Sequence, residues 1–458
     1  MKKYRINIFW GICLAGLGVS CQKGFLDQRP DKALLVPATT ADMQALLDNT
    51  DVFNTGPGLT FIADGDMWTT DAGYNAYNTD MERNSYTWSK DIFAGQSCPD
   101  WNIPYQQVFY ANVVLEGLAK LPRGNTDALS RNLKGTALFD RALAFYNLAQ
   151  LFCAPYDPAT AAATPGIPVR LTADVNSRLP RASLQEVMDQ VLADLDAAGP
   201  LLPFRAAYKS RPTVAARWAL LSRIYLGMGN YGQAEAFADS VLAAGAVLID
   251  YNTLSRTATR PFPRALPDGN DEVIFYQAQS SYSFANAASP TFLVPELYGS
   301  YAVNDLRGAL FGRQLTPGNF KFKGTYAGSL LQFSGLATDE LLLVRAECRA
   351  RRGELTGAMG DLNALLVKRW AAGTFQPYRA VDAADALRQV LQERRKELVG
   401  RGLRWADLRR LNRDPLFRLR LSRSVGGKDD TLEPGSPRYV YPIPEEEIRL
   451  GGLVQNER

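Results

Sequence analysis

Histidine is absent from the 458 residues of the sequence. Its absence excludes the Ser-His-Asp triad, the Cys-His pair, the histidine general base and every zinc site with a histidine ligand. A glycosidase needs only two carboxylates at a fixed separation, but no pair of acidic residues stands in a sequence context that marks such a site. An enzyme is therefore the least favoured class of protein.

A large excess of charge of either sign is also lacking. Lysine and arginine number 51 against 47 acidic residues, and three of the cations, Lys2, Lys3 and Arg5, lie at the N-terminus. The rest of the chain is close to neutral, so it lacks the strongly basic surface that nucleic-acid binding requires. We expect no nucleic-acid partner.

Long hydrophobic runs are missing, apart from one near the N-terminus. Residues 6–17 are apolar except for Asn7, and the run is shorter than the ~20 residues of a membrane-spanning helix. The segment LGVSC that follows at residues 17–21 resembles the bacterial lipobox, in which the cysteine is acylated and becomes the mature N-terminus. We predict a lipoprotein signal peptide at residues 1–20 and lipidation of Cys21, with an ordinary signal peptide as the alternative.

Cysteine is scarce. Cys13 falls within the signal peptide and Cys21 carries the lipid, which leaves Cys98, Cys153 and Cys348. These three share no short spacing, so neither a zinc knuckle nor a Cys-x-x-Cys motif is present. We expect free, mostly buried thiols and no metal ligands among them.

Helical periodicity dominates what the sequence does contain, and it occurs in pairs of helices. The clearest pair spans residues 214–244, with a turn at Gly229 between two apolar stripes. Large, small, aromatic and turn positions there resemble a tetratricopeptide repeat: Trp218, Leu221, Ser222, Tyr225, Gly229, Tyr231 and Ala234. Because Ser222 and Ala234 are small, we expect the two helices to approach closely, with Trp218 filling the flank.

Further helical stretches predict more pairs, although Arg345 and Arg349 weaken the match in one of them. These stretches are 101–118, 129–152 with 183–198, 339–370 and 383–411. Repeats of this kind stack into a curved solenoid. The predicted fold class is therefore mostly α, a tetratricopeptide-like helical-repeat solenoid with long irregular, aromatic-rich loop insertions.

The predicted domain organisation is one domain after the signal peptide, at residues 21–458. It has helical repeats at about 101–245 and 338–411 and irregular segments at about 54–100 and 250–335. Loops of that length inside a folded domain usually carry function, so we expect the irregular segments to bind ligand.

Motifs at both ends of the chain resemble those of one known family. They are FLD at 25–27, the Trp101-x3-Tyr105 helix with Asn112, ERRKEL at 393–398, GLRWADLRR at 402–410 and YPIP at 441–444. Together they resemble the SusD/RagB family of outer-membrane nutrient-binding lipoproteins. Arg401 departs from the pattern, because the family usually has glutamate before the glycine that follows.

The resemblance implies a cell-surface protein of the outer membrane that is anchored through Cys21. It implies a partner, a SusC-like TonB-dependent transporter, to which a captured oligosaccharide or polysaccharide is delivered. It also implies that no reaction is catalysed and that no cofactor is needed. A peptide- or protein-binding helical-repeat scaffold is the alternative function.

The charged residues of the ERRKEL block give a separate expectation. Glu393, Arg394, Arg395 and Glu397 are predicted to form ion pairs on a helix surface, worth a few tenths of a kcal/mol each. We therefore interpret this block as scaffold and not as a binding site.

Aromatic side chains in the irregular segments are the predicted ligand-binding residues. Sugar rings stack their C–H faces on aromatic faces, and their hydroxyl groups need polar partners at the edge. The alternative is that these rings pack the loops onto the helices. The predicted site residues are Trp68, Asp71, Tyr74, Tyr77, Trp88, Tyr282, Tyr298 and Tyr301.

The anchor prediction is tested by changing Cys21→Ser. Without its thiol the residue cannot be acylated, so the full-length variant should leave the membrane fraction when it is expressed without its partner. Fractionation and labelling with a fatty-acid analogue measure both effects. A variant that still fractionates with membranes would contradict the lipoprotein prediction.

Overall fold

The structure, a computed structural model, describes residues 37–121, 127–267, 269–285 and 289–458. The predicted signal peptide and Cys21 lie outside these residues. None of the described helices is long and apolar enough to cross a membrane.

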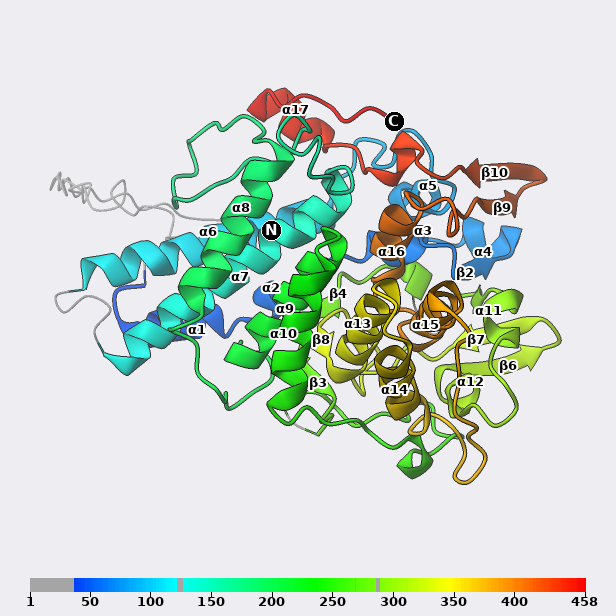
Figure 1. Ribbon diagram of the computed structural model, residues 1–458. Coiled ribbons are helices and arrows are strands. Elements are labelled where there is room, and N and C mark those ends of the chain that lie inside the picture. Colours follow the sequence, from blue (N-terminus) through cyan, green and yellow to red (C-terminus); the bar gives the residue numbers. More distant parts are fainter. Residues whose placement is uncertain (1–36, 122–126, 268, 286–288) are drawn as a thin grey trace, which may run out of the picture. The chain divides into compact units, whose positions relative to one another are not determined.

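Long helices pack against one another in the order of the chain (Figure 1). α6 and α7 pack together, α7 packs on α8, and α9 forms a pair with α10. α13 packs on α10, on α14 and on α15, which continues the array across a gap of almost one hundred residues. These helices are α6 (Pro99–Lys120), α7 (Ala128–Phe152), α8 (Leu184–Ala198), α9 (Val214–Gly227), α10 (Tyr231–Ala243), α13 (Thr338–Arg351), α14 (Leu355–Leu366) and α15 (Ala383–Glu397). The prediction of a mostly α, helical-repeat fold is confirmed.

The α9–α10 pair shows why the repeat positions need small residues. The Ser222 hydroxyl donates to the carbonyl oxygen of Ala234 at 2.8 Å, and both residues are fully buried. Gly229 makes the turn with φ +77°, a conformation that favours glycine. The Trp218 ring is half-buried and packs against the core from its edge, while α9 directs Ala219 and Leu220 into the core.

The two segments expected to be irregular contain short helices and strands. Capping by Thr70 and Thr79 starts two of the helices, which are too short for the helical period to appear in the sequence. The first segment has β1 (Thr55–Gly56), α3 (Leu59–Ala63), β2 (Met67–Thr69), α4 (Asp71–Asn75) and α5 (Asp80–Tyr86). The second has β3 (Val273–Phe275), β4 (Ala278–Gln279), β5 (Thr291–Leu293), α11 (Pro295–Gly299), α12 (Leu306–Phe311), β6 (Gly312–Thr316) and β7 (Asn319–Phe322).

These two segments fold onto each other. A four-stranded sheet has the order β2-β5-β7-β6, so its edge strand comes from the first segment and the rest from the second. β1 pairs in parallel with β4, and β3 pairs with β8 (Leu336–Ala337). The pairing of segments more than two hundred residues apart is what holds both in place.

The C-terminal region contains two features that helical periodicity does not predict. The polar run at 422–436 includes most of a β-hairpin, β9 (Leu421–Val425) and β10 (Lys428–Leu432), because Gly426 and Gly427 supply the two positive φ angles of a tight turn. The stretch 383–411 is two helices, since Gly400 and Gly402, both with positive φ, separate α15 from α16 (Arg404–Leu411). The remaining elements are α1 (Thr40–Leu47), α2 (Thr50–Phe53) and α17 (Glu445–Gly451), with short 3-10 turns at 251–253, 283–285 and 437–439.

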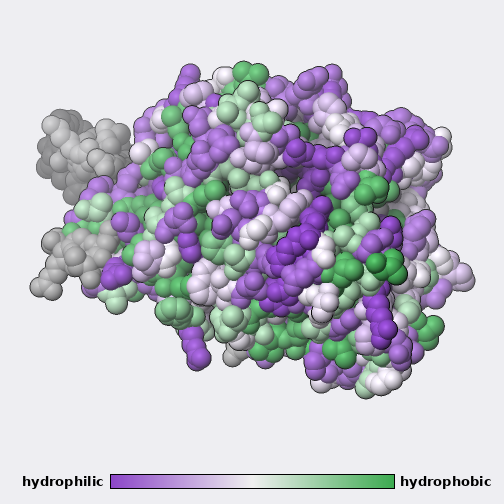
Figure 2. All heavy atoms as spheres, viewed as in Figure 1, coloured by the Kyte–Doolittle hydropathy of each residue, from purple (hydrophilic) through white to green (hydrophobic). Residues whose placement is uncertain are grey.

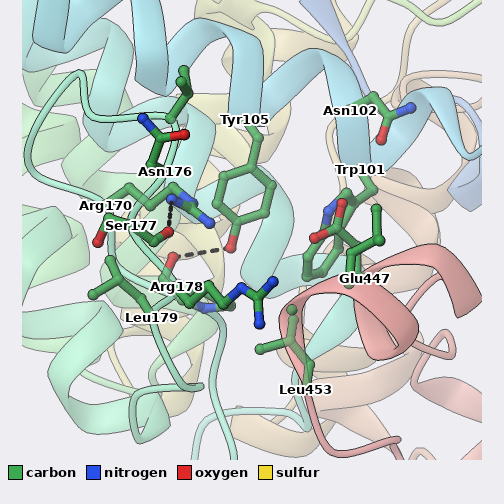
Figure 3. A pocket seen from close by; sticks show the side chains of 14 residues that line it. Trp101, Asn102, Tyr105, Arg170, Asn176, Ser177, Arg178, Leu179, Glu447 and Leu453 are labelled. Carbon is green, nitrogen blue, oxygen red and sulfur yellow. Dashed lines mark hydrogen bonds between the residues drawn. The ribbon is translucent and has the colours of Figure 1, made fainter.

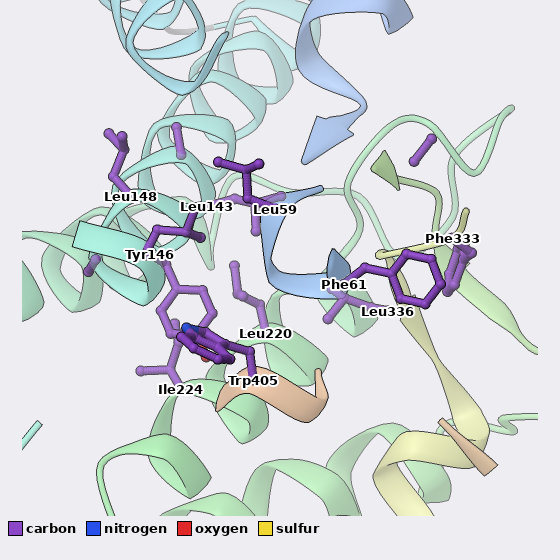
Figure 4. Packing of buried hydrophobic residues seen from close by; sticks show 14 of the residues in the cluster. Leu59, Phe61, Leu143, Tyr146, Leu148, Leu220, Ile224, Phe333, Leu336 and Trp405 are labelled. Atoms are coloured by element: carbon purple, nitrogen blue, oxygen red, sulfur yellow. The ribbon is translucent and has the colours of Figure 1, made fainter. Parts of the chain in front are cut away.

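The main hydrophobic core lies where the helical array meets the short elements (Figure 4). Tyr146 of α7, Leu220 of α9 and Trp405 of α16 pack there, and Leu59 and Phe61 of α3 belong to the same cluster. The core therefore joins parts of the chain that are far apart in sequence.

The charged residues of the ERRKEL block are buried, so the expectation of surface ion pairs was wrong. Glu393 and Glu397 are less than 5% exposed. Arg307 lies 2.5 Å from Glu393 and 3.1 Å from Glu397, and Arg369 lies 2.7 Å from Glu397 and from Glu272. These pairs connect α15 to α12 and to the segment after α14, which a helix-surface pattern cannot reveal.

Two further contacts complete this network. The Tyr326 hydroxyl donates to Glu272 at 2.7 Å, and burial raises the pKa of Glu272 to about 7 although the nearby Arg369 opposes the shift. Arg401, the residue that departs from the family pattern, donates to Asp339 at 2.9 Å. Its charge is thus paired within the described chain.

Removing one member of the network should destabilise the fold strongly. Arg369→Ala leaves Glu272 buried without its cation and leaves Glu397 with Arg307 as its one remaining partner, so we expect the free energy of unfolding to fall by about 3–5 kcal/mol. Urea unfolding followed by tryptophan fluorescence measures the change. Arg352→Ala is the matched control, because Arg352 is half exposed, Glu354 is exposed, and the buried Glu235 keeps Arg349 as a partner. Equal effects of the two changes would contradict this interpretation of the network.

Candidate functional site

Three of the predicted ligand-binding residues lie in the core. Trp88 is 1% exposed, and its indole N–H donates to the carbonyl oxygen of Ala63 at 2.9 Å. The Tyr282 hydroxyl donates to Asp100 at 3.0 Å, and the Tyr77 hydroxyl lies 2.9 Å from that of Thr291. In this arrangement the three rings pack short elements together, which is the alternative that the sequence left open.

Three predicted residues lie together at the β2–α4 junction and reach solvent. The Trp68 ring is half-buried against Phe292 at a centroid distance of 5.3 Å, and Tyr74 is also half-buried. Asp71 is exposed and accepts a hydrogen bond from the Gly426 amide at the tip of the β9–β10 hairpin. The Trp68 indole nitrogen is buried and has no hydrogen-bond partner in the described chain.

The last two predicted residues belong to a different cluster. Tyr298 stacks on Phe320 with ring centroids 3.5 Å apart, and the Tyr301 hydroxyl donates to the carbonyl oxygen of Lys396. Phe320 is paired with Leu293, whereas Trp68 is paired with its neighbour Phe292. Side chains alternate between the faces of a sheet, so the sheet separates Trp68 from the Tyr298 cluster.

Hydrophilic and hydrophobic residues are mixed over the face of the molecule in Figure 2. Hydrophilic residues cover most of that face, and hydrophobic residues form small separate groups.

A cavity elsewhere offers a better enclosed site. It has a volume of about 480 Å³ and lies between the start of α6, loop 168–179 and α17 (Figure 3). We call it the α6–α17 cavity. Its lining residues are Trp101, Asn102, Tyr105, Pro168, Arg170, Val175, Asn176, Ser177, Arg178, Leu179, Glu447, Leu450, Gly451 and Leu453.

Helix α6 supplies the aromatic part of the cavity. Tyr105 is partly exposed, and its hydroxyl donates to the carbonyl oxygen of Pro168 at 2.9 Å, so its ring is fixed in orientation. Trp101 is only 2% exposed, packed edge to face on Phe152 and against the Tyr105 ring. Tyr105 is thus the ring that a ligand can reach, and Trp101 holds it from behind.

Loop 168–179 is pinned to α6 by side chains of that helix. The Asn112 amide donates to the carbonyl oxygens of Arg170 and Thr172, at 3.1 and 3.0 Å. Glu116 accepts from the Ala173 amide at 2.7 Å. Asn112 in turn accepts from Arg141 of α7 at 2.8 Å. The loop has little regular structure of its own. Hydrogen bonds from α6, which α7 supports, determine the position of its backbone.

The opposite wall comes from α17 and the chain end. The Arg181 guanidinium donates to the carbonyl oxygen of Val454 at 2.9 Å, and Asn456 donates to those of Phe152 and Tyr441. Glu447 of α17 is partly exposed in the cavity. Burial raises the pKa of Glu447, and a hydrogen bond from Trp101 and the charge of Arg170 oppose the shift.

The cavity combines groups that suit a polar, ring-shaped ligand. Tyr105 offers an aromatic face, while Asn102, Asn176 and the guanidinium groups of Arg170 and Arg178 can bond to hydroxyl or acidic groups. No sequence-predicted site residue lines this cavity. The available signal was the long segment without helical period between α7 and α8, which contributes loop 168–179.

The described residues show neither a metal-binding cluster nor a reactive thiol. No group of three or more acidic or cysteine residues there could hold a metal ion. Cys98, Cys153 and Cys348 are free and buried, as expected, and burial raises the pKa of the Cys153 and Cys348 thiols to about 12. These thiols are therefore protonated and unreactive at neutral pH.

Family models and solved structures are similar to this chain. A model described as "Starch-binding associating with outer membrane" matches residues 24–226, and one described as "SusD family" matches residues 338–458. A comparison with curated proteins gave no match.

Three solved structures illustrate the likeness in fold. A SusD superfamily protein from Bacteroides thetaiotaomicron is 21% identical with a TM-score of 0.71, covering 92% of this chain and 100% of that one. One from Bacteroides vulgatus is 20% identical with a TM-score of 0.74, covering 91% and 98%. A SusD-like carbohydrate binding protein from Bacteroides vulgatus is 19% identical with a TM-score of 0.64, covering 90% and 96%.

The two models match separate parts of the chain that together make up most of it. Both are models of SusD-like proteins. The C-terminal match includes the ERRKEL, GLRWADLRR and YPIP motifs. The chain therefore belongs to the SusD/RagB family.

Proposed function

We propose that this protein is a cell-surface, lipid-anchored binding protein that captures a glycan and delivers it to a SusC-like TonB-dependent transporter without cleaving it. The α6–α17 cavity is the observation that carries the proposal. Its volume of about 480 Å³ is within the range of small-molecule sites. A short oligosaccharide, or the end of a longer polymer, is therefore the proposed occupant.

The side chains of the cavity favour a sugar. Tyr105 is held by its hydroxyl bond to Pro168, so a sugar ring that stacks on it does not have to order it first. The nearby Asn102 and Asn176 side chains are exposed and offer both donors and acceptors to hydroxyl groups. An open site of this kind excludes water poorly, so we expect affinities of roughly micromolar to millimolar.

The cluster of Trp68, Asp71 and Tyr74 is the second candidate for ligand contact. Its support is the Trp68 ring, which is only half-buried, beside the exposed carboxylate of Asp71. None of its residues lines the α6–α17 cavity, so it suits an extended polymer better than a short oligosaccharide. Peptide binding is the alternative function, and titration with peptides distinguishes it from glycan binding at either site.

The first binding test compares two changes at Tyr105. Tyr105→Ala removes the stacking ring and should weaken glycan binding at least tenfold, whereas Tyr105→Phe keeps the ring and should retain most of the affinity. Calorimetry across a panel of neutral and acidic oligosaccharides and peptides measures both. The thermal unfolding midpoint of each variant shows whether it is folded.

A Trp68→Ala, Tyr74→Ala double variant is the control for the second candidate. If it loses binding while folded Tyr105→Ala retains it, the site lies at the β2–α4 junction instead of the cavity. If only peptides bind the wild-type protein, the glycan proposal is wrong.

The proposed partner is tested by purification from native outer membranes under mild detergent. An affinity tag at the C-terminus would disturb Asn456, which bonds to Phe152 and Tyr441, so the tag belongs at the tip of the β9–β10 hairpin, beside Gly426. A large TonB-dependent barrel should copurify with the wild-type protein from cells grown on the inducing nutrient. Recovery of the protein alone under those conditions would contradict the partner assignment.

A further inference from the structure

The lining of the α6–α17 cavity carries more positive than negative charge. Arg170 and Arg178 line it and form no ion pair with any described carboxylate, and Glu447 is the only acidic residue in the lining. Other arginines without a carboxylate partner, such as Arg409 and Arg423, are buried and donate to carbonyl oxygens instead. Two unpaired guanidinium groups in one concave site are thus a feature of the cavity.

The position of Arg170 is set by the protein before any ligand binds. Its Nη1 donates to the carbonyl oxygen of Ser177 at 2.8 Å, and its own carbonyl oxygen is held by Asn112 at 3.1 Å. One edge of the guanidinium is used in this way, and its other donors have no partner among the described residues. A planar group fixed at one edge presents the remaining edge to an acidic group in a defined direction.

Arg178 is exposed and extends from loop 168–179 toward the α17 side of the cavity (Figure 3). No hydrogen bond or ion pair holds its guanidinium within the described chain, in contrast to the neighbouring Arg181, which has three carbonyl partners. Arg178 is therefore the cavity cation that a ligand can engage at the least cost in lost protein contacts.

Glu447 limits how much negative charge the cavity accepts. Its carboxylate lies beside Trp101 in the cavity lining and within the electrostatic influence of Arg170. Glu446 on the same helix points away into an exposed pair with Arg449. The cavity lining thus carries two cations and one anion, and a ligand with one negative charge balances the difference.

We propose, on the basis of the proposed glycan-binding function, that the natural ligand is an acidic oligosaccharide, with a uronic-acid carboxylate held by Arg170 and Arg178 while its ring stacks on Tyr105. The carboxylate of the sugar accepts hydrogen bonds that the two guanidinium groups can donate and that no described residue accepts. The aromatic face supplies the contact for the C–H side of the same ring.

The test uses matched ligands that differ only in charge. Wild-type protein is titrated by calorimetry with uronic-acid oligomers, such as oligogalacturonate, oligomannuronate and glucuronate-containing oligomers, and with their methyl esters. At least one acid should bind about tenfold or more tightly than its ester. The advantage of the acid should shrink as sodium chloride is raised, because its attraction to the exposed Arg178 is screened.

Variants then assign the preference to the cavity. Arg178→Gln should reduce the affinity for the acid about tenfold and leave that for the ester unchanged, and Glu447→Gln should increase the affinity for the acid. Arg449→Gln is the matched control: it removes the same charge from exposed α17 surface outside the cavity lining and should change neither affinity.

The outcomes separate this inference from the function on which it rests. Esters or neutral glycans that bind as tightly as the acids, in a Tyr105-dependent way, would overturn the acidic-ligand inference and leave glycan capture intact. Acid binding that Arg449→Gln weakens as much as Arg178→Gln would also overturn it, since a general charge effect would explain both. Failure of every glycan to bind would overturn the proposed function itself.

Discussion

The buried ion-pair network around Glu397 is the constraint on which the rest of the fold depends. Arg307 and Arg369 are completely buried, and they bring their carboxylate partners together from α15, from β3 and from the start of α12. A buried charge without a partner costs several kcal/mol, so these segments cannot separate independently. The network therefore acts as a junction between the helical array and the second non-helical segment, which has few long elements of its own.

A similar arrangement positions the α6–α17 cavity. Arg141 of α7 pairs with Asp194 of α8 at 2.6 Å and also donates to Asn112 of α6, which in turn holds the backbone of loop 168–179. Three helices of the array thus determine the position of a loop without regular structure. The Trp-x3-Tyr pattern with its following asparagine takes on a physical meaning here, because Trp101 and Tyr105 form the aromatic side of the cavity while Asn112 fixes its wall.

The aromatic rings in the two segments of short helices and strands have two different roles. Strands of two to five residues and helices of one or two turns bury little backbone, so large rings supply most of the contact that holds them. Trp88, Tyr77 and Tyr282 serve this purpose, and their polar atoms are bonded inside the fold. Composition alone cannot distinguish such rings from rings that face solvent, since both occur in segments without helical period. Only Trp68 and Tyr74 of the first segment retain an exposed side, and Asp71 lies beside them at the surface.

The sequence by itself determined the helices, their pairing and the family, because these depend on local periodicity, on caps such as the Ser183–Glu186 box, and on motifs of contiguous residues. It also determined that the thiols are buried and that histidine chemistry is absent. The tertiary structure alone decided which charges are buried and which rings are exposed. Glu397 meets Arg307 across ninety residues, and Tyr105 meets Arg178 and Glu447 from three separate parts of the chain. Such contacts follow from how the helices stack, and that packing depends on side chains distant in sequence, which no local pattern encodes.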